Sequence, residues 1–144
     1  MFSERVGNLM ERNNLLTVPS ETTVSKAASL MAQRKVGAVM VLDNQKLVGI
    51  FTERDAVFRV IAQGRDAQAT RLSEVMTAAP ITVDPDKSYG YALLLMHEKG
   101  FRHMPVLEGG KLVGIVSARN AMDPDMEEFV SETQRRKQIL REQI

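Results

Sequence analysis

The sequence predicts an α/β fold built from two equivalent units that pack about a pseudo-twofold axis. The main observation is an internal repeat, in which residues 17–55 align without a gap on residues 82–120 at an offset of 65, with 13 of 39 pairs identical. Each copy also alternates helical and strand patterns within roughly 60 residues, a size at which a lone core is marginal. The two copies are therefore expected to share one core.

Both copies begin with the same two short elements. A short apolar helix ending in Met opens each copy, and a brief extended stretch follows it. These elements are Val6–Met10 and Leu15–Pro19 in the first copy, and Leu72–Met76 and Pro80–Pro85 in the second. The opening helices are offset by 66 positions rather than 65, which indicates one residue gained or lost before the strand.

A longer helix comes next, because apolar side chains recur at helical spacing behind a hydroxyl residue that can cap the first turn. In the first copy Thr23 is the cap, and the apolar face consists of Val24, Ala27, Ala28, Leu30 and Met31. In the second copy Ser88 is the cap, Gly100 suits the helix end, and the apolar face consists of Tyr89, Ala92, Leu93, Leu95 and Met96.

Two short runs rich in β-branched residues then predict a hairpin in each copy. The strands are expected at Val36–Leu42 and Lys46–Phe51 in the first copy, and at Phe101–Leu107 and Lys111–Val116 in the second. Turn residues such as Asp43 and Glu108 fill the gaps between these strands.

A second helix is expected where each hairpin ends. In the first copy it starts at Thr52, and its apolar positions are Ala56, Val57, Val60 and Ile61. The polar stretch after it contains Gly64 and is interpreted as a linker. The repeats are therefore expected to span residues 3–64 and 65–122.

Residues 123–144 lie outside the repeat and are predicted to form an amphipathic helix. Pro124 suits the first helical position, and acidic residues in the first turn precede the basic run Arg135–Lys137, as the helix dipole favours. Two interpretations stay open. The helix packs on its own domain, or it forms an arm that grips a second subunit.

Composition excludes several classes of function. The net charge is +1, with 19 basic and 18 acidic side chains, which gives no electrostatic basis for binding nucleic acid or an anionic membrane. Without cysteine there are no disulfides and no thiolate metal sites. No apolar run resembles a signal peptide or is long enough to span a bilayer, so a cytoplasmic protein is expected.

The strand-to-helix segment Gly49–Asp55 is the candidate for chemistry. Thr52 stands where helix N–H groups are free, Arg54 adds a guanidinium suited to phosphate, and Asp55 offers a carboxylate suited to the vicinal hydroxyls of a ribose. The alternative is plain helix capping by Thr52, with Asp55 on the surface. The same pattern recurs at Gly114–Asn120, and this repetition favours a binding site.

The order of elements and the two motifs together resemble a pair of CBS domains, also called a Bateman module. Further matching signatures are Thr17–Pro19, Ile81–Val83 and Phe101–Val106, and the resemblance covers residues 3 to about 122. It implies a protein that is not an enzyme. Such a module binds adenosine-containing ligands in clefts between the repeats and regulates an attached or partnered enzyme, channel or transporter.

The resemblance implies one better and one weaker nucleotide site. In the better site Asp55 would hold the ribose, and the remaining members are Ile50, Thr52, Arg54, Pro80, Ile81, Thr82, Arg102, His103, Met104, Pro105 and Arg119. His103 is either a phosphate donor or an ordinary strand histidine. The weaker site, where Asn120 replaces the family's usual Asp, comprises Thr17, Gly37, Ala38, Ile115, Ser117 and Asn120.

The expected regulatory ligand is AMP, ATP or NAD(H), with S-adenosylmethionine ranked behind them. No catalytic cofactor is expected, and no metal, since the two histidines are not at metal-ligand spacing. A homodimer is expected, because CBS pairs commonly stack through their helices. The alternative is a structural dimerisation or adaptor module without a ligand. The sequence does not name the regulated enzyme or transporter.

Overall fold

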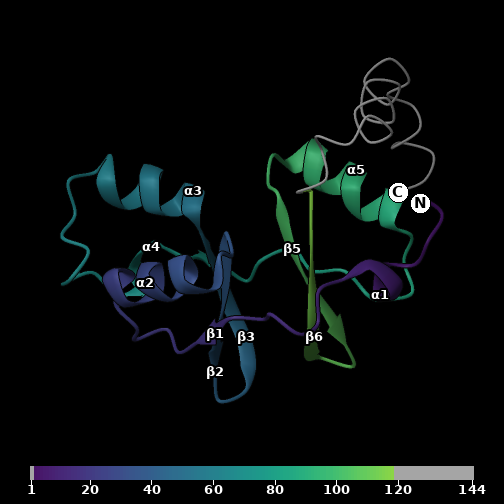
Figure 1. The fold of residues 1–144 in the computed structure, drawn as a ribbon, viewed down its shortest axis with the longest axis horizontal. Helices are drawn as coiled ribbons and strands as arrows, with labels where there is room; N and C mark the ends of the chain where they lie inside the picture. The colour runs from purple at the N-terminus through teal and green to yellow at the C-terminus, as the bar shows by residue number, and fades with distance from the viewer. Residues whose placement is uncertain (1, 119–144) are drawn as a thin grey trace. The chain divides into compact units, whose positions relative to one another are not determined.

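The computed structural model describes residues 2–118 and has the mixed α/β fold that the sequence predicts (Figure 1). Within these residues the chain forms two compact units. Unit 1 combines residues 2–11, 82–108 and 113–118, and unit 2 combines residues 12–81 and 109–112. The helix expected at residues 123–144 lies outside the described residues.

Unit 2 contains a four-stranded sheet in the order β1-β2-β3-β4. The short strand β1 (Thr17–Val18) runs parallel to β2 (Ala38–Asp43), whereas β3 (Lys46–Thr52) is antiparallel to both β2 and β4 (Thr77–Ala78). The hairpin predicted in the first repeat is thereby confirmed. Its turn residues, 44 and 45, both have positive φ, as a two-residue hairpin turn requires.

The first hairpin begins two residues later than expected because the preceding helix uses those residues to end. Helix α2 (Val24–Arg34) is capped by Thr23, whose side chain accepts a hydrogen bond from the Lys26 amide at 3.2 Å. Lys35 then adopts a left-handed conformation, and the Val36 amide donates to the Met31 carbonyl at 3.0 Å. This bond closes the helix, so strand pairing starts only at Ala38.

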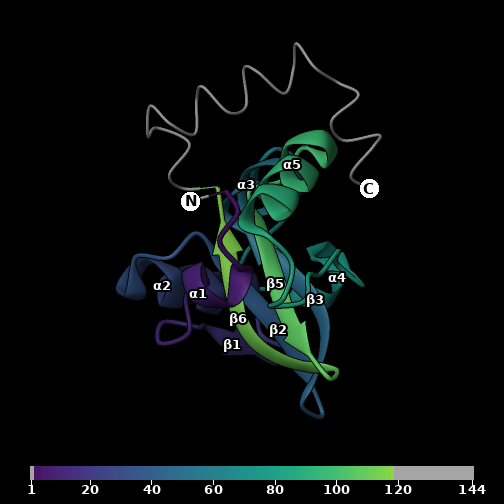
Figure 2. The ribbon, with the colours of Figure 1, turned by 90° about the vertical axis from the view of Figure 1, so that its right-hand side faces the viewer.

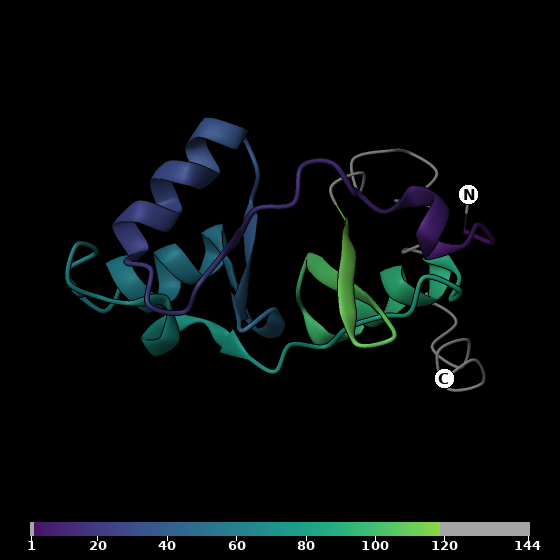
Figure 3. The same ribbon diagram turned by 90° about the horizontal axis from the view of Figure 1, so that it is seen from below.

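One face of the unit 2 sheet carries the hydrophobic core. The helices that cover it are α2 and a second helix that begins as α3 (Glu53–Asp55) and continues as the π-helix η1 (Ala56–Ile61), and Figure 3 shows both on the same side of the strands. Helix α4 (Leu72–Val75) completes the layer. The fully buried members of this core are Ala27, Val39, Val41, Phe51, Val60 and Leu72.

The predicted apolar faces of the helices are partly wrong. Val57 and Ile61 are 49% and 70% exposed, and Ala28 is also exposed. The Ala62 amide bonds to the Val57 carbonyl at 2.8 Å, five residues back. Because a π-helix has more residues per turn than an α-helix, a periodicity of 3.6 assigns its inward positions incorrectly.

Unit 1 repeats this plan with less regular pairing. Its hairpin consists of β5 (His103–Glu108) and β6 (Lys111–Ser117). Helix α5 (Tyr89–Lys99), capped by Ser88 and ended by Gly100, and helix α1 (Val6–Leu9) lie on one side of this hairpin (Figures 1 and 2). Isolated bridges join residue 83 to 106 and residue 11 to 115, in the places that β1 and β4 occupy in unit 2.

The two repeats exchange their opening helices. Helix α1 belongs by sequence to the first repeat but packs in unit 1, and α4 belongs to the second repeat but packs in unit 2. A Cβ atom added to Gly49 would lie 2.4 Å from the Met76 Sδ, and one added to Gly114 would lie 2.6 Å from the Met10 Sδ. The units of packing therefore differ from the units of repetition, whose boundary at residues 64 and 65 stays a prediction.

Candidate functional site

The strand-to-helix junction of unit 2 holds Thr52 and Asp55 in a reciprocal capping box. The Thr52 hydroxyl accepts a hydrogen bond from the Asp55 amide at 3.2 Å, and the Asp55 Oδ2 accepts one from the Thr52 amide at 2.9 Å. The Thr52 Oγ1 also lies 3.2 Å from the same carboxylate oxygen. Local backbone geometry thus fixes the carboxylate before any ligand is considered.

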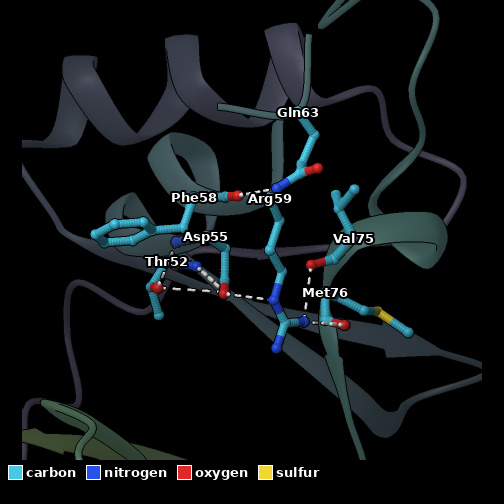
Figure 4. Close-up of polar contacts among 7 residues, drawn as sticks. All are labelled: Thr52, Asp55, Phe58, Arg59, Gln63, Val75 and Met76. Atoms are coloured by element: carbon cyan, nitrogen blue, oxygen red, sulfur yellow. Dashed lines mark hydrogen bonds and ion pairs between the residues drawn. The ribbon is translucent and has the colours of Figure 1, made fainter. Parts of the chain in front are cut away.

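Asp55 is one of two buried polar or charged residues of the described chain, and it is 9% exposed. Its second carboxylate oxygen, Oδ1, lies 3.5 Å from the Nε of Arg59, one turn further along the helix (Figure 4). Helix capping by Thr52 is therefore confirmed, whereas the alternative that places Asp55 on the surface is wrong. A buried carboxylate that keeps a cation beside it is suited to accept hydrogen bonds from hydroxyl groups.

The start of this helix offers fewer free amides than the sequence suggested. The Glu53 amide donates to the Gly37 carbonyl at 3.0 Å, and the Asp55 amide is used by Thr52. These bonds take donors that an anion would otherwise use. Arg54 is exposed beside them, and its guanidinium carbon lies 5.3 Å from the centre of the Phe58 ring. Of the two features of this motif that were expected to bind an anion, the exposed Arg54 is therefore better suited to a phosphate than the start of the helix.

Only some of the other predicted residues of unit 2 lie on or next to the β2–β3 hairpin. Ile50 is buried in β3, and Ala38 is buried at the start of β2, directly opposite Thr52. Gly37 is buried next to Ala38. Further along the chain Pro80 is half-buried and Ile81 is 41% exposed, while Thr17 is exposed on β1. The structure therefore brings residues 50, 52, 54 and 55 of the expected better site together with residues 37 and 38, which were expected in the weaker site, at one end of the β2–β3 hairpin.

Two predicted residues of unit 1, Arg102 and His103, lie at the matching end of its hairpin. Arg102 is exposed and His103 is half-buried at the start of β5, and the Ala118 amide donates to the Arg102 carbonyl at 2.9 Å. Thr82 and Ile115 are half-buried. Met104 and Pro105 are fully buried, and Met104 belongs to the core of unit 1. Contact between these two residues and an adenine ring stays a prediction.

The second motif differs from the first at its equivalent position. Ser117 ends β6, and its carbonyl accepts a hydrogen bond from the Tyr89 hydroxyl at 3.1 Å. Burial raises the pKa of Tyr89, so its phenol stays protonated and remains a donor. Arg119 and Asn120 lie outside the described residues, and the composite sites that join residues of both repeats stay predictions.

Two residues were missed by the sequence analysis. Arg59 lies four positions after Asp55, a spacing at which opposite charges meet on a helix, so this signal was present in the sequence. Asp43 was interpreted as an ordinary turn residue. Its carboxylate accepts hydrogen bonds from the Ser20 amide at 3.0 Å and the Ser20 hydroxyl at 2.6 Å, which a local pattern could not reveal.

Residues 2–118 contain neither a candidate metal site nor a candidate membrane span. No group of three or more His, Asp or Glu side chains in that part of the chain is placed to hold a metal ion. None of its helices combines the length and apolarity that crossing a bilayer requires.

The chain belongs to the CBS domain family, which matches residues 6–62 and 72–124. The CBS domain-containing protein YhcV of Bacillus subtilis is 42% identical over 101 residues, which are 70% of this chain and 71% of that protein. A CBS domain-containing protein of Arabidopsis thaliana is 37% identical over 78% of this chain. The match spans only 21% of the Arabidopsis protein.

Solved structures of CBS domain proteins share the fold. A protein with CBS domains from Burkholderia ambifaria superimposes with a TM-score of 0.72 at 38% identity, over 79% of this chain and 84% of that chain. A CBS domain protein from Pyrobaculum aerophilum, solved in complex with AMP, superimposes with a TM-score of 0.75 at 25% identity, over 88% of this chain and 98% of that chain.

Proposed function

We propose that this chain binds an adenine nucleotide at Asp55 and regulates a partner protein rather than catalysing a reaction. The observation that carries the proposal is the capping box, which holds the carboxylate of Asp55 buried, oriented and next to a cation. A buried charge is costly unless it is paired. The position of Asp55, just after β3 ends, suits a ligand site. The AMP bound by the Pyrobaculum relative supports this choice of ligand class.

The ribose is the part of the nucleotide that Asp55 recognises. Two vicinal hydroxyls donate to one carboxylate, and a hydrogen bond to a charged group contributes roughly 1.5–3 kcal/mol. Arg54 is placed one residue away to meet a phosphate, and Ile50 lies opposite Met40 in the hairpin to contact the base. AMP is the first candidate, ATP and NAD(H) follow, and S-adenosylmethionine, which has no phosphate for Arg54, ranks last.

Regulation follows if the nucleotide binds two arrangements of the protein with different affinity. A ligand shifts an equilibrium only by the difference between its affinities for the two states. The nucleotide then changes how a partner enzyme or transporter is bound. No feature of the chain identifies the partner protein that is regulated.

Thermal unfolding tests the proposal with AMP, ATP, NAD and S-adenosylmethionine added separately. A ligand at about 100 times its Kd stabilises the folded state by about 2.7 kcal/mol, so the melting temperature rises. Asp55→Asn keeps an oxygen for the capping bond but removes the charge, and it should abolish most of the rise. Asp66→Asn is the matched control, because the Asp66 carboxylate only accepts from the Gln68 amide at 2.9 Å in a surface turn. A melting temperature that no nucleotide raises would reject the proposal.

A structural adaptor module without a ligand is the second candidate, and one observation favours it. Val57, Phe58 and Ile61 form an exposed apolar face on η1, with exposed fractions of 49%, 57% and 70%. Such a face suits self-association, which a nucleotide-binding homodimer also requires. The two candidates differ at Asp55. An adaptor tolerates Asp55→Asn at no cost to its association, and it shows no response to nucleotides.

A further inference from the structure

Arg59 contacts Asp55 on one side and the end of α4 on the other, and the proposed function uses only the contact with Asp55. We propose that Arg59 is a positioning residue that links the carboxylate of Asp55 to residues 72–78, here called the α4–β4 segment. Nucleotide binding at Asp55 is transmitted through Arg59 to this segment. The identity of the ligand in this inference rests on the proposed function, whereas the link between the two elements does not.

On the side of Asp55, three contacts orient the carboxylate. Two come from Thr52 to Oδ2, and the third comes from the Arg59 Nε to Oδ1 at 3.5 Å. A carboxylate offers about four lone-pair positions, so Oδ1 keeps acceptor capacity for a ligand hydroxyl. Arg59 and the ligand hydroxyl therefore share one oxygen atom, and each is sensitive to the other.

On the side of α4, one nitrogen of the same guanidinium bonds to two carbonyl groups. The Arg59 Nη1 donates to the Val75 carbonyl at 3.2 Å and to the Met76 carbonyl at 3.1 Å (Figure 4). These carbonyls lie at the end of the helix, where backbone acceptors have no partner within the helix. A planar guanidinium with five donors can serve all three acceptors at once, which a lysine ammonium cannot do in the same geometry.

The α4–β4 segment is also tied to β3. Strand β4 pairs with β3, and the Met76 side chain packs on Gly49. Just after the segment, the Ala79 amide donates to the Val48 carbonyl at 3.2 Å. Along the chain, only residues 79–81 separate this segment from residue 82, where the chain passes from unit 2 into unit 1. A change at Arg59 therefore acts on the last structured stretch of unit 2 before that passage.

The physical consequence is reciprocal coupling. A hydroxyl that donates to Oδ1 alters the charge that Arg59 meets, and so it alters how firmly Arg59 holds the two carbonyls. Thermodynamic linkage makes this effect mutual. The factor by which the ligand changes the equilibrium of the carbonyl contacts equals the factor by which those contacts change the affinity for the ligand.

The first experiment compares Arg59→Gln with a matched control, Arg65→Gln. Arg65 also bonds to α4, since its Nη1 donates to the Glu74 Oε1 at 3.3 Å, but this contact does not involve Asp55. Calorimetry gives the Kd for AMP, and hydrogen exchange by NMR follows the Met76 and Ala79 amides. In the wild-type protein AMP should slow exchange at both amides. Arg59→Gln should weaken AMP binding about fivefold and remove the slowing, and Arg65→Gln should keep both properties.

A second experiment needs no ligand. Asp55→Asn should speed exchange of the Met76 amide several-fold in the nucleotide-free protein, because Arg59 loses its counter-charge. In an Arg59→Gln background the same substitution should have no further effect, which is the non-additivity expected of coupled residues. Arg59→Lys keeps the positive charge, so it should protect the Met76 amide from exchange better than Arg59→Gln does, but less well than the wild-type arginine.

The outcomes separate the two proposals. If wild-type protein binds AMP and Arg59→Gln behaves like Arg65→Gln, the inference is wrong while the proposed function stands. If the wild-type protein binds none of the nucleotides, the proposed function fails, and the ligand-free experiment still decides the link. Independent, additive effects of Asp55→Asn and Arg59→Gln on the Met76 amide overturn it.

Discussion

At the scale of single residues, the repeated glycines of the strand-to-helix motif are explained by packing. Gly49 and Gly114 lie within the most similar stretch of the repeat, Lys46–Ile50 and Lys111–Ile115, and each is packed against a methionine that follows an opening helix. The added Cβ atoms would approach the Met76 and Met10 side chains to 2.9 Å or less. A requirement for close approach, rather than for a ligand, accounts for glycine at both positions.

Gly49→Ala should lower the free energy of unfolding by about 1–3 kcal/mol, the usual cost of overpacking. Urea denaturation measures this loss. Met76→Ala in the same chain removes the clash, so the double variant should be more stable than the sum of the two single losses. If the two losses of stability are strictly additive, the Met76 side chain is not what clashes with a side chain at position 49.

Asp43 is a second residue whose role is structural. Hydrogen bonds from the Ser20 side chain and backbone hold the pKa of Asp43 below its usual value. Because the folded-state pKa is lower than the unfolded one, the ionised carboxylate stabilises the fold above the unfolded pKa. That contribution is lost as the pH falls through the folded pKa.

Asp43→Asn should therefore be less stable than the wild-type chain near neutral pH, and the difference should shrink on acidification below about pH 4. Urea unfolding of both chains between pH 7 and pH 2 measures it. Ser20→Ala removes the hydroxyl donor to Asp43 and keeps the amide donor, so its loss of stability should also shrink on acidification. A stability difference that is constant with pH would contradict this role.

At the scale of elements, caps and turns could be predicted because they depend on neighbouring residues. Thr23, Ser88 and Gly100 stand where the sequence placed them, and both hairpins have the predicted turns. The inward face of η1 could not be predicted. Its hydrogen bonds join residues five positions apart, and this spacing depends on how the helix packs on the sheet. The sequence therefore predicted a helix after Thr52 but misplaced Val57 and Ile61.

The exposed face of η1 leads to a prediction about association. Ile61→Lys should change the stability of the single chain by no more than about 0.5 kcal/mol, because the residue is 70% exposed. It should weaken self-association, which sedimentation velocity measures over a range of concentrations. Gln68→Lys adds the same charge on the exposed loop that follows the helix and should leave association intact. Equal association of both variants would exclude this face as the contact.

At the scale of the whole molecule, the sequence repeat identifies which segments are alike but not which segments pack together. Helix α4 follows the first repeat in the sequence and completes its core, since Leu72 and Val75 are buried among residues of unit 2. For the same reason the sequence could place Asp55 next to Thr52, but not Arg59 next to the carbonyl of Met76. Contacts between distant segments are what the repeat could not predict.

The exchange of opening helices predicts which fragments fold. A fragment of residues 12–81 contains α4 and the Met76–Gly49 contact, whereas a fragment of residues 3–64 lacks both and carries α1 without its partners. The first should unfold cooperatively in thermal circular dichroism and give dispersed NMR spectra, although a core of this size is marginal. Equal or greater stability of the 3–64 fragment would contradict the exchange.

The central claim is that Asp55 holds the sugar of an adenine nucleotide, and a crystal structure of the chain with AMP tests it most directly. The account predicts that the ribose hydroxyls donate to the Asp55 carboxylate at about 2.5–2.7 Å, with the capping bonds of Thr52 retained. AMP bound with its ribose away from Asp55 would contradict the account. So would crystals that contain no AMP after growth at a saturating concentration.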